Sequence, residues 1–292
     1  MKDSTFFKKV KKIEIIASRL VESLLSGNYR SIFKGQGIEF DEVREYVYGD
    51  DVRLIDWNVT SRIGAPFTKT FKEEREITLF IIVDLSASIF SGCGNTDKRE
   101  IESLIFAILG LSAILNNDRV GALFFSDRIE RWVPPAKGKK HVLRLIHDLV
   151  NLKPKGTGSA LGLALRTAGE SLKRRGVCVI ISDYKTHRFL DELSIISRKH
   201  DCIAVKIYNT SDFSFPETGT IEIIDPESKK TMLAGGIFKK FTDSYKKYWE
   251  SFHLKWLKDC HKRGIETLEI NTKDNPGIKL YEFFQRRKLK RL

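Results

Sequence analysis

An almost unbroken apolar run at residues 77–83, ITLFIIV, restricts the fold of this chain more than any other segment. It is rich in β-favouring residues and stops on Asp84. Such a run is typical of a strand buried on both faces, as in a parallel sheet covered by helices on its two sides. A second run of this kind, VCVIIS at residues 177–182, stops on Asp183. These two runs therefore predict two buried strands of a parallel sheet, and the aspartates that follow them are candidate functional residues.

Between and around these strands, helical and extended patterns alternate from residue 77 to residue 208. Residues 98–117, 139–152 and 190–200 have the length and apolar spacing of helices, and residues 156–176 predict a helix that ends at Gly176. Residues 119–126 and 202–208 predict further strands. Residues 128–135 end at a proline pair and fit an edge strand. This alternation predicts an α/β fold with a doubly wound, mainly parallel sheet.

The flanking segments predict two additions to this core. Residues 1–76 are expected to hold an N-terminal helix and a small β-containing module over about 33–71. Residues 209–292 are expected to complete the α/β domain with two short strands, a long helix over about 238–263, a last strand of the main sheet at 265–272 and a final helix. The expected division is therefore 1–76, 77–208 and 209–292.

The charge distribution argues against sequence-specific nucleic-acid binding. The net charge is +13, but residues 1–12 contribute +4 and the last eight residues +5, so the body of the chain is near +4. No helix-turn-helix, RNA-recognition or zinc-finger pattern is present. Basic ends on a nearly balanced body are typical of solvated tails or of weak tethers to an anionic surface, so peripheral contact with a membrane is compatible with the sequence.

The sequence favours a cytoplasmic protein. No apolar run approaches the roughly 20 residues of a membrane-spanning helix, and the N-terminal segment alternates charged and apolar residues without the apolar core of a secretion signal. Four cysteines are scattered without metal-binding spacing and are expected to be free buried thiols, as suits a reducing compartment: Cys93, Cys178, Cys202 and Cys260.

Polar side chains gather where the expected strands end. Asp84, Ser86 and Ser88 form a DLSAS turn, Thr157 lies in the KGTGSAL loop before a helix, and Asp183 follows the later strand. In a doubly wound sheet these loops can meet at one edge. Two carboxylates and three hydroxyls are hard oxygen donors of the kind that Mg²⁺ prefers, and Mn²⁺ accepts the same set. A site with so few charges would leave the metal open to a carboxylate from a partner protein.

Each part of this set has a structural alternative. DLSAS alone also fits a turn in which Asp84 or Ser86 caps the next helix. Thr157 alone fits a helix N-cap, and Asp183 alone is a common strand-end residue. The metal hypothesis depends on all of them occurring together, in this order, at strand ends.

The D-x-S-x-S, Thr, Asp order resembles the metal-ion-dependent adhesion site (MIDAS) of von Willebrand factor A domains, on Asp84, Ser86, Ser88, Thr157 and Asp183. Upstream, GQGIEFDEVREYVYGDDVRLIDWNVTSR and KTFKEERE resemble the signature of the bacterial domain of unknown function 58 (DUF58) family, and the C-terminal segments do so too, from about residue 35 to 287. Two departures are visible: the loop lacks the second glycine and the acid that often flank the threonine, and Ile89 replaces a frequent methionine.

The resemblance implies an adaptor rather than an enzyme. Members of the family are typically associated with MoxR-type AAA+ ATPases, so the resemblance implies such an ATPase as a partner. It also implies that the metal ion binds an acidic residue of another protein.

The block at residues 39–56 is acidic within this basic chain, with seven acids and two arginines. One interpretation is an acidic docking face for a partner. The favoured interpretation is a partly buried network in which Asp50, Asp51, Asp56 and nearby arginines satisfy one another, because the apolar residues Val52, Ile55 and Trp57 interleave the charges. Unpaired burial of such charges would be costly.

A Mg²⁺-dependent hydrolase or phosphatase that uses Asp84 is the alternative function. A haloacid-dehalogenase-like enzyme needs a second acid two residues after its aspartate as general acid and base, and this chain has Ser86 there. No GxSxG or phosphate-loop motif occurs. His187 is the one histidine near the expected site, and we interpret it as a surface-loop residue rather than a general base. The sequence therefore favours a metal-dependent adaptor over an enzyme.

Overall fold

The computed structural model describes residues 2–25, 39–72, 76–90, 97–212, 220–224, 231–235 and 239–290. The chain forms two compact units: Met1–Phe33 together with Thr78–Leu292, and Lys34–Ile77. The N-terminal helix α1 (Lys2–Leu25) belongs to the larger unit. The segment expected as one N-terminal region, 1–76, is thus divided between the two units, because α1 packs on helices of the larger one.

The larger unit contains a six-stranded sheet in the order β10-β7-β6-β3-β4-β5. All neighbouring pairs are parallel except β4 and β5, which are antiparallel. The predictions of an edge strand at 128–135 and of a last sheet strand near 265–272 are confirmed, since β5 and β10 form the two edges. The strands are β3 (Thr78–Asp84), β4 (Arg119–Phe125), β5 (Ile129–Ala136), β6 (Val177–Ser182), β7 (Asp201–Tyr208) and β10 (Glu266–Asn271).

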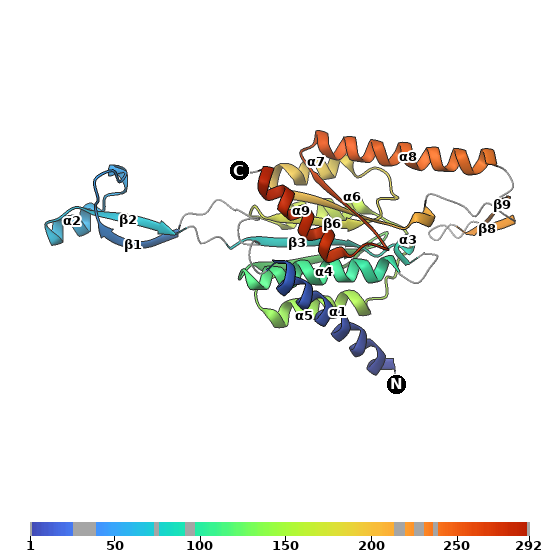
Figure 1. Cartoon of the computed structure of the whole chain (residues 1–292), viewed down its shortest axis with the longest axis horizontal. Coiled ribbons are helices and arrows are strands. Elements are labelled where there is room, and N and C mark those ends of the chain that lie inside the picture. Colours follow the sequence, from blue (N-terminus) through green and yellow to red (C-terminus); the bar gives the residue numbers. More distant parts are fainter. Residues whose placement is uncertain are drawn as a thin grey trace. The chain divides into compact units, whose positions relative to one another are not determined.

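Helices cover both faces of this sheet, which confirms the predicted doubly wound α/β arrangement (Figure 1). Helices α1, α4, α5 and α9 pack together on one face, and α6, α7 and α8 cover the other. Among the described residues, no helix is long and apolar enough to cross a membrane. The remaining helices of this unit are α3 (Ala87–Phe90), α4 (Lys98–Leu115), α5 (Lys139–Asn151), α6 (Leu161–Ser171), α7 (Leu190–Lys199), α8 (Lys239–Lys262) and α9 (Pro276–Lys290), with a 3-10 turn η3 (Thr210–Asp212).

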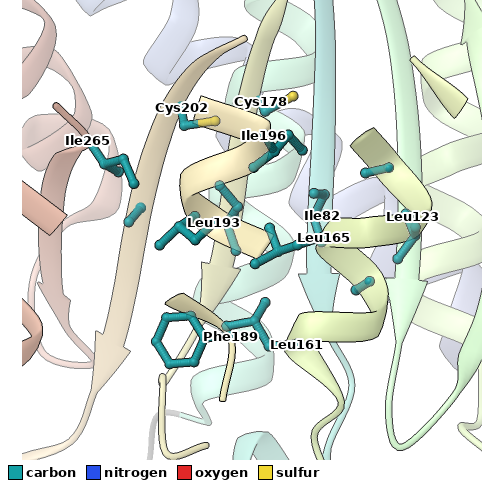
Figure 2. Close-up of a cluster of buried hydrophobic side chains, with 14 of the residues drawn as sticks. Ile82, Leu123, Leu161, Leu165, Cys178, Phe189, Leu193, Ile196, Cys202 and Ile265 are labelled. Carbon is teal, nitrogen blue, oxygen red and sulfur yellow. The ribbon is translucent and has the colours of Figure 1, made fainter. Parts of the chain in front are cut away.

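The hydrophobic core is built from strand side chains that point alternately to the two faces of the sheet. Every residue of β3 after Thr78 is buried, and Phe80 and Ile82 point to the face covered by α6 and α7. Figure 2 shows Leu165 of α6 beside Ile82, with Leu193 of α7 in the same buried layer. Burying an apolar side chain of this size contributes about 1.5–3 kcal/mol, so this layer holds the strand ends in place.

Three of the four cysteines, Cys178, Cys202 and Cys260, are free and buried, as expected. Cys93 lies outside the described residues. The two short C-terminal strands, β8 (Thr220–Ile224) and β9 (Thr231–Gly235), form an antiparallel pair of their own.

Helix α6 is shorter than predicted, because it ends at Ser171 and not at Gly176. Leu172 already has an extended backbone, with φ −86° and ψ 103°. Gly176 instead serves a close approach between chain segments: a Cβ placed there would lie 2.5 Å from the carbonyl oxygen of Thr78. The prediction that the helix ends at Gly176 was therefore wrong, because this glycine is needed for close packing against Thr78.

In the described part of the smaller unit, residues 39–72 and 76–77, an antiparallel strand pair is accompanied by two short helices. Its elements are β1 (Glu39–Glu45), the 3-10 turn η2 (Val52–Leu54), α2 (Trp57–Ile63) and β2 (Phe67–Lys72).

The predicted partly buried Asp/Arg network forms only in part: Arg44 donates to Oδ1 of Asp50 at 2.7 Å in a partly buried ion pair, whereas Asp51 and Asp56 serve other contacts. Asp51 and Asp56 accept hydrogen bonds from backbone N–H groups at the start of η2 and α2, so they cap these turns. Asp56 also pairs with Lys69 at 3.3 Å. Trp57, which was expected to interleave with buried charges, is 69% exposed. The acids satisfy local backbone donors here, a role that charge patterning alone does not reveal.

We expect Gly176→Ala to lower the free energy of unfolding by about 1–3 kcal/mol, because the new methyl group would collide with the backbone at Thr78 and force a shift. Urea denaturation measures this change. Gly169→Ala in α6 is the matched control, since its nearest neighbour atoms lie 4.0 Å away and alanine favours a helix. Equal stability of the two variants would show that the approach at Gly176 relaxes without cost.

Candidate metal-binding site at the strand ends

The predicted residues meet at the point where the sheet changes direction. From β3 the chain runs outward through β4 and β5, and it then returns to place β6 on the other side of β3. Ligands of doubly wound sheets bind outside the carboxyl ends of the strands at such a point. Asp84 is the last residue of β3, and Asp183 follows the last residue of β6. Val83 pairs with Ile181, so the two aspartates leave neighbouring strands at the same edge.

Asp84 connects three segments of the chain through hydrogen bonds. Its Oδ1 accepts from the backbone N–H of Ser86 at 2.9 Å. Its Oδ2 accepts from the hydroxyls of Ser182 at 2.7 Å and Ser159 at 2.8 Å. Asp84 is fully buried and holds the DLSAS turn, the end of β6 and the loop before α6 together.

Sequence reasoning missed Ser159 and Ser182. Ser182 directly precedes Asp183 at the end of a buried strand, and its hydroxyl also accepts from the backbone N–H of Tyr184 at 2.9 Å. Ser159 lies two residues after Thr157. Both positions were available as polar residues at the correct sheet edge, but an isolated serine beside a stronger motif gives no signal of its own.

The hydroxyls of Ser86 and Ser88 lie 3.0 Å apart, and both residues are buried. This distance is an ordinary O–H···O hydrogen bond. It is also the separation of about 3 Å that two adjacent ligands have when each lies about 2.1 Å from an octahedral Mg²⁺ ion. The pair can therefore exchange its mutual hydrogen bond for two bonds to a cation with little movement.

Thr157 reaches the site through its backbone. Its carbonyl oxygen accepts from the N–H of Ala87 at 2.8 Å, which joins its loop to the DLSAS turn. The carboxylate of Glu130 anchors this loop by accepting from the N–H groups of Lys155 and Gly156 at 2.8 and 3.0 Å. The side chain of Thr157 is exposed.

Gly156 permits this loop to lie close to the end of β4. A Cβ at this position would lie 2.4 Å from the hydroxyl oxygen of Ser126 and 2.1 Å from Oδ1 of Asp127. The glycine before Thr157 is therefore explained by space, independently of any ligand.

The electrostatics of Asp84 favour a nearby cation. Burial raises the pKa of Asp84 to about 6, and the Asp183 carboxylate adds to this rise, while hydrogen bonds from Ser182 and Ser86 oppose it. Among the described residues, the groups that donate to its oxygens are neutral: the backbone N–H of Ser86 and the hydroxyls of Ser159 and Ser182. A buried carboxylate with neutral donors and a second carboxylate nearby is stabilised by any positive charge that enters the space between them.

One fixed positive charge is already present beside Asp183. The Nζ of Lys98, the first residue of α4, lies 3.5 Å from Oδ2 of Asp183 and 2.8 Å from Oδ2 of Asp212. Lys185 approaches the same Asp212 at 2.8 Å. Although burial opposes it, the two lysines keep the pKa of Asp212 below its ordinary value. The side chain of Lys98 is fully buried, so it pins α4 and η3 to the end of β6.

No sequence pattern revealed this ion-pair cluster. Lys98 begins an apolar helix, where a lysine is normally solvated, and Asp212 lies in a short 3-10 turn far along the chain. Their proximity is a property of the tertiary structure.

A second buried acid lies deeper on α4. Burial raises the pKa of Glu102 to about 8 in spite of Arg99, whose guanidinium donates to it at 2.9 Å, and the carboxylates of Asp84 and Asp183 raise it further. Glu102 is therefore mostly protonated at neutral pH and adds little negative charge below the strand ends. His187 is exposed, as expected for a surface-loop residue.

The residues fit a hard divalent cation if hydroxyls supply part of the shell. Among the described residues, no three histidine, cysteine, aspartate or glutamate side chains group closely enough to hold a metal. The donor set here is instead two carboxylates with the paired hydroxyls of Ser86 and Ser88. Oδ2 of Asp84 already accepts two hydrogen bonds, so this residue suits a role in orienting the hydroxyls and bound water.

These features define an α/β protein with a polar, partly charged site at the switch point of a mostly parallel sheet. Residues 42–249 match the family described as "Protein of unknown function DUF58". The match covers more than half of the chain, so this protein belongs to the DUF58 family, as its sequence motifs indicated.

Two further comparisons give related proteins without an assigned function. Uncharacterized proteins of Mycobacterium bovis and Mycobacterium tuberculosis are each 28% identical over 222 residues, which covers 75% of this chain and 70% of theirs.

The solved structure of an aerotolerance-related membrane protein from Bacteroides fragilis is similar with a TM-score of 0.49 and 14% identity, covering 73% of this chain and 99% of that one. BatB from Bacteroides thetaiotaomicron has a TM-score of 0.46 and 13% identity, covering 72% and 98%. Neither similarity assigns a function to this chain.

In metal-free protein we expect stability to fall as the pH rises through the folded pKa of Asp84. This pKa is about 6, above the ordinary value of 3.8, so ionisation is easier in the unfolded chain. The cost is absent below about pH 4 and complete above about pH 6–7, and it amounts to about 3 kcal/mol. Urea denaturation in EDTA across this pH range measures it.

Asp84→Asn should remove this component, so the difference in unfolding free energy between wild type and variant should change by about 3 kcal/mol across the range. Exposed Glu170→Gln in α6 should follow the wild-type curve. Parallel curves for wild type and Asp84→Asn would contradict the raised pKa.

Proposed function

We propose that this protein is a metal-dependent adaptor with a MIDAS-type site in a von Willebrand factor A-like domain. Asp84, Ser86, Ser88, Thr157 and Asp183 would hold Mg²⁺, or Mn²⁺, and a carboxylate of a partner protein would complete the coordination. The observation that carries the proposal is the 3.0 Å hydroxyl pair of Ser86 and Ser88 beside the buried Asp84 carboxylate, whose donors are neutral.

The chain's own residues suit binding of an external acid. Ser86 and Ser88 provide neutral ligands, and Asp84 orients the turn that carries them. Lys98 offsets the charge of Asp183, so the site holds little net negative charge of its own. A cation in such a site keeps its attraction for a further carboxylate, because the protein does not neutralise it completely.

The alternative is a Mg²⁺-dependent hydrolase in which Asp84 attacks the substrate. Asp84 suits this role less well, because both of its oxygens already accept hydrogen bonds within a fully buried network. The position two residues later, where a proton-transferring acid would be needed, is occupied by Ser86, whose hydroxyl faces Ser88. The adaptor is therefore the function that the geometry supports best.

The proposed partner is a MoxR-type AAA+ ATPase, which follows from membership of the DUF58 family. We place the adaptor in the cytoplasm, where its basic terminal segments would allow peripheral contact with the inner face of the membrane.

We expect Mg²⁺ to raise the melting temperature of the wild type, because a ligand that binds only the folded state stabilises it. At a concentration of about 100 times Kd the gain is about 2.7 kcal/mol. Asp84→Ala and Ser86→Ala should each abolish this gain. Ser197→Ala is the matched control, since it removes a hydroxyl from α7, away from the strand ends. Differential scanning fluorimetry with Mg²⁺ or EDTA measures the effect.

A full Mg²⁺ response in both site variants would contradict the metal proposal. Phosphatase turnover that needs Mg²⁺ and disappears in Asp84→Asn would replace the adaptor with the hydrolase.

We expect tagged wild-type protein to retain a MoxR-type ATPase from a lysate of its own organism in Mg²⁺ and to release it in EDTA, because the partner's carboxylate binds through the metal. Ser86→Ala should retain little of it in either buffer, and Ser197→Ala should behave as wild type. Quantitative mass spectrometry of the bound fraction measures the ratio. Equal recovery with wild type and Ser86→Ala would show that any such contact does not use this site.

A further inference from the structure

A groove with a volume of about 500 Å³ lies between the loop after β6 and helix α8. Its walls are mostly apolar and include Phe189, Leu190, Tyr248, Phe252 and Trp256. The volume lies in the range of small-ligand sites and is ample for one large side chain. None of the predicted metal ligands is among the residues that line it, so it is a separate feature of the same unit.

The groove adjoins the candidate metal site through two hydrogen bonds. Thr186 lines the groove, and its Oγ1 donates to the carbonyl oxygen of Ser159 at 2.9 Å. The hydroxyl of the same Ser159 donates to Oδ2 of Asp84 at 2.8 Å. A short extended segment that binds the metal and runs toward Thr186 would therefore reach the groove within a few residues. A segment that runs in the opposite direction would not.

The groove has a rigid floor and an accessible rim. Trp256 is only 3% exposed and packs on Tyr184 with ring centroids 4.9 Å apart. Tyr248 at the rim is 53% exposed and stacks on Phe252 at 6.4 Å. His187 contacts Phe252 edge-on at 5.8 Å. Aromatic walls of this kind favour an aromatic guest, which gains offset or edge-to-face contacts in addition to burial.

The rim is predominantly positive. Arg188 and Lys255 line it and are exposed, with Asp259 as the acid on the same lining. The charge of the rim complements an acidic segment and disfavours a basic one.

We propose that this groove receives an aromatic side chain from an acidic segment of the partner protein, close in sequence to the carboxylate that binds the metal. This inference rests on the proposed function and adds the chemistry of the partner: an acidic peptide with an aromatic anchor. A single buried aromatic anchor commonly carries much of the affinity of such an interface.

The test uses synthetic Gly/Ser peptides that contain one Asp and one Trp separated by one to five residues in either order. Matched peptides carry Ala for Trp or Asn for Asp. Fluorescence anisotropy with the full chain, in Mg²⁺ and in EDTA, gives each affinity. We expect the best Trp–Asp spacing to bind at least tenfold more tightly than its Ala counterpart, and only in Mg²⁺.

Surface variants separate the groove from the rest of α8. Tyr248→Ala and Lys255→Glu change exposed lining residues and should each weaken the Trp–Asp peptide about tenfold without weakening the Ala–Asp peptide to the same degree. Leu254→Ala and Lys258→Glu are matched controls on the same helix, because both residues are exposed and neither lines the groove. The controls should bind as wild type.

The outcomes distinguish the two proposals. Mg²⁺-dependent binding of Asp peptides with no advantage from Trp, or no effect of Tyr248→Ala, overturns the groove and leaves the metal proposal standing. Trp-dependent binding that is sensitive to Tyr248→Ala but indifferent to Mg²⁺ and to Asn for Asp supports the aromatic site and overturns its link to the metal. No binding by any peptide overturns the inference.

Discussion

The buried carboxylate of Asp84 is the interaction on which the arrangement of the site depends. It accepts hydrogen bonds from three segments: the turn after β3, the end of β6 and the loop before α6. Because these segments are far apart in sequence, a single fully buried side chain fixes the spacing of the strand-end loops. The same burial raises the pKa of Asp84, so the folded protein carries an electrostatic cost that a cation would relieve.

Charge balance around the strand ends is achieved in two ways. The ammonium of Lys98 compensates Asp183 and Asp212 within the protein, whereas Asp84 receives hydrogen bonds from neutral groups. The cluster is therefore only partly neutralised, and the part that remains negative lies beside the hydroxyls of Ser86 and Ser88. This asymmetry is the physical basis for placing a divalent cation at the hydroxyl pair and for expecting it to attract an acid from outside.

Much of the fold could be predicted from the sequence, because apolar runs that alternate with helical periods allow few arrangements other than a covered parallel sheet. The edge position of β5 was predictable from its proline pair, whereas β10 was predicted only as the last strand of the main sheet. The end of α6 was predicted wrongly. Gly176 is required by close backbone packing against Thr78, which lies 98 residues earlier in the chain. The acids at Asp51 and Asp56 were also misjudged, because capping is set by local backbone geometry rather than by the pattern of charges.

By itself the sequence determined the sheet, the family and the order of the polar residues at its strand ends, since these depend on local periodicity and on motif spacing. Only the tertiary structure decided which groups surround them. Ser159, Ser182, Lys98 and Asp212 come from four separate segments, and the groove of Tyr248 and Trp256 needs α8 to pack beside the loop after β6. Burial and proximity arise when distant segments pack together, and they set the charge and the shape that any partner would meet.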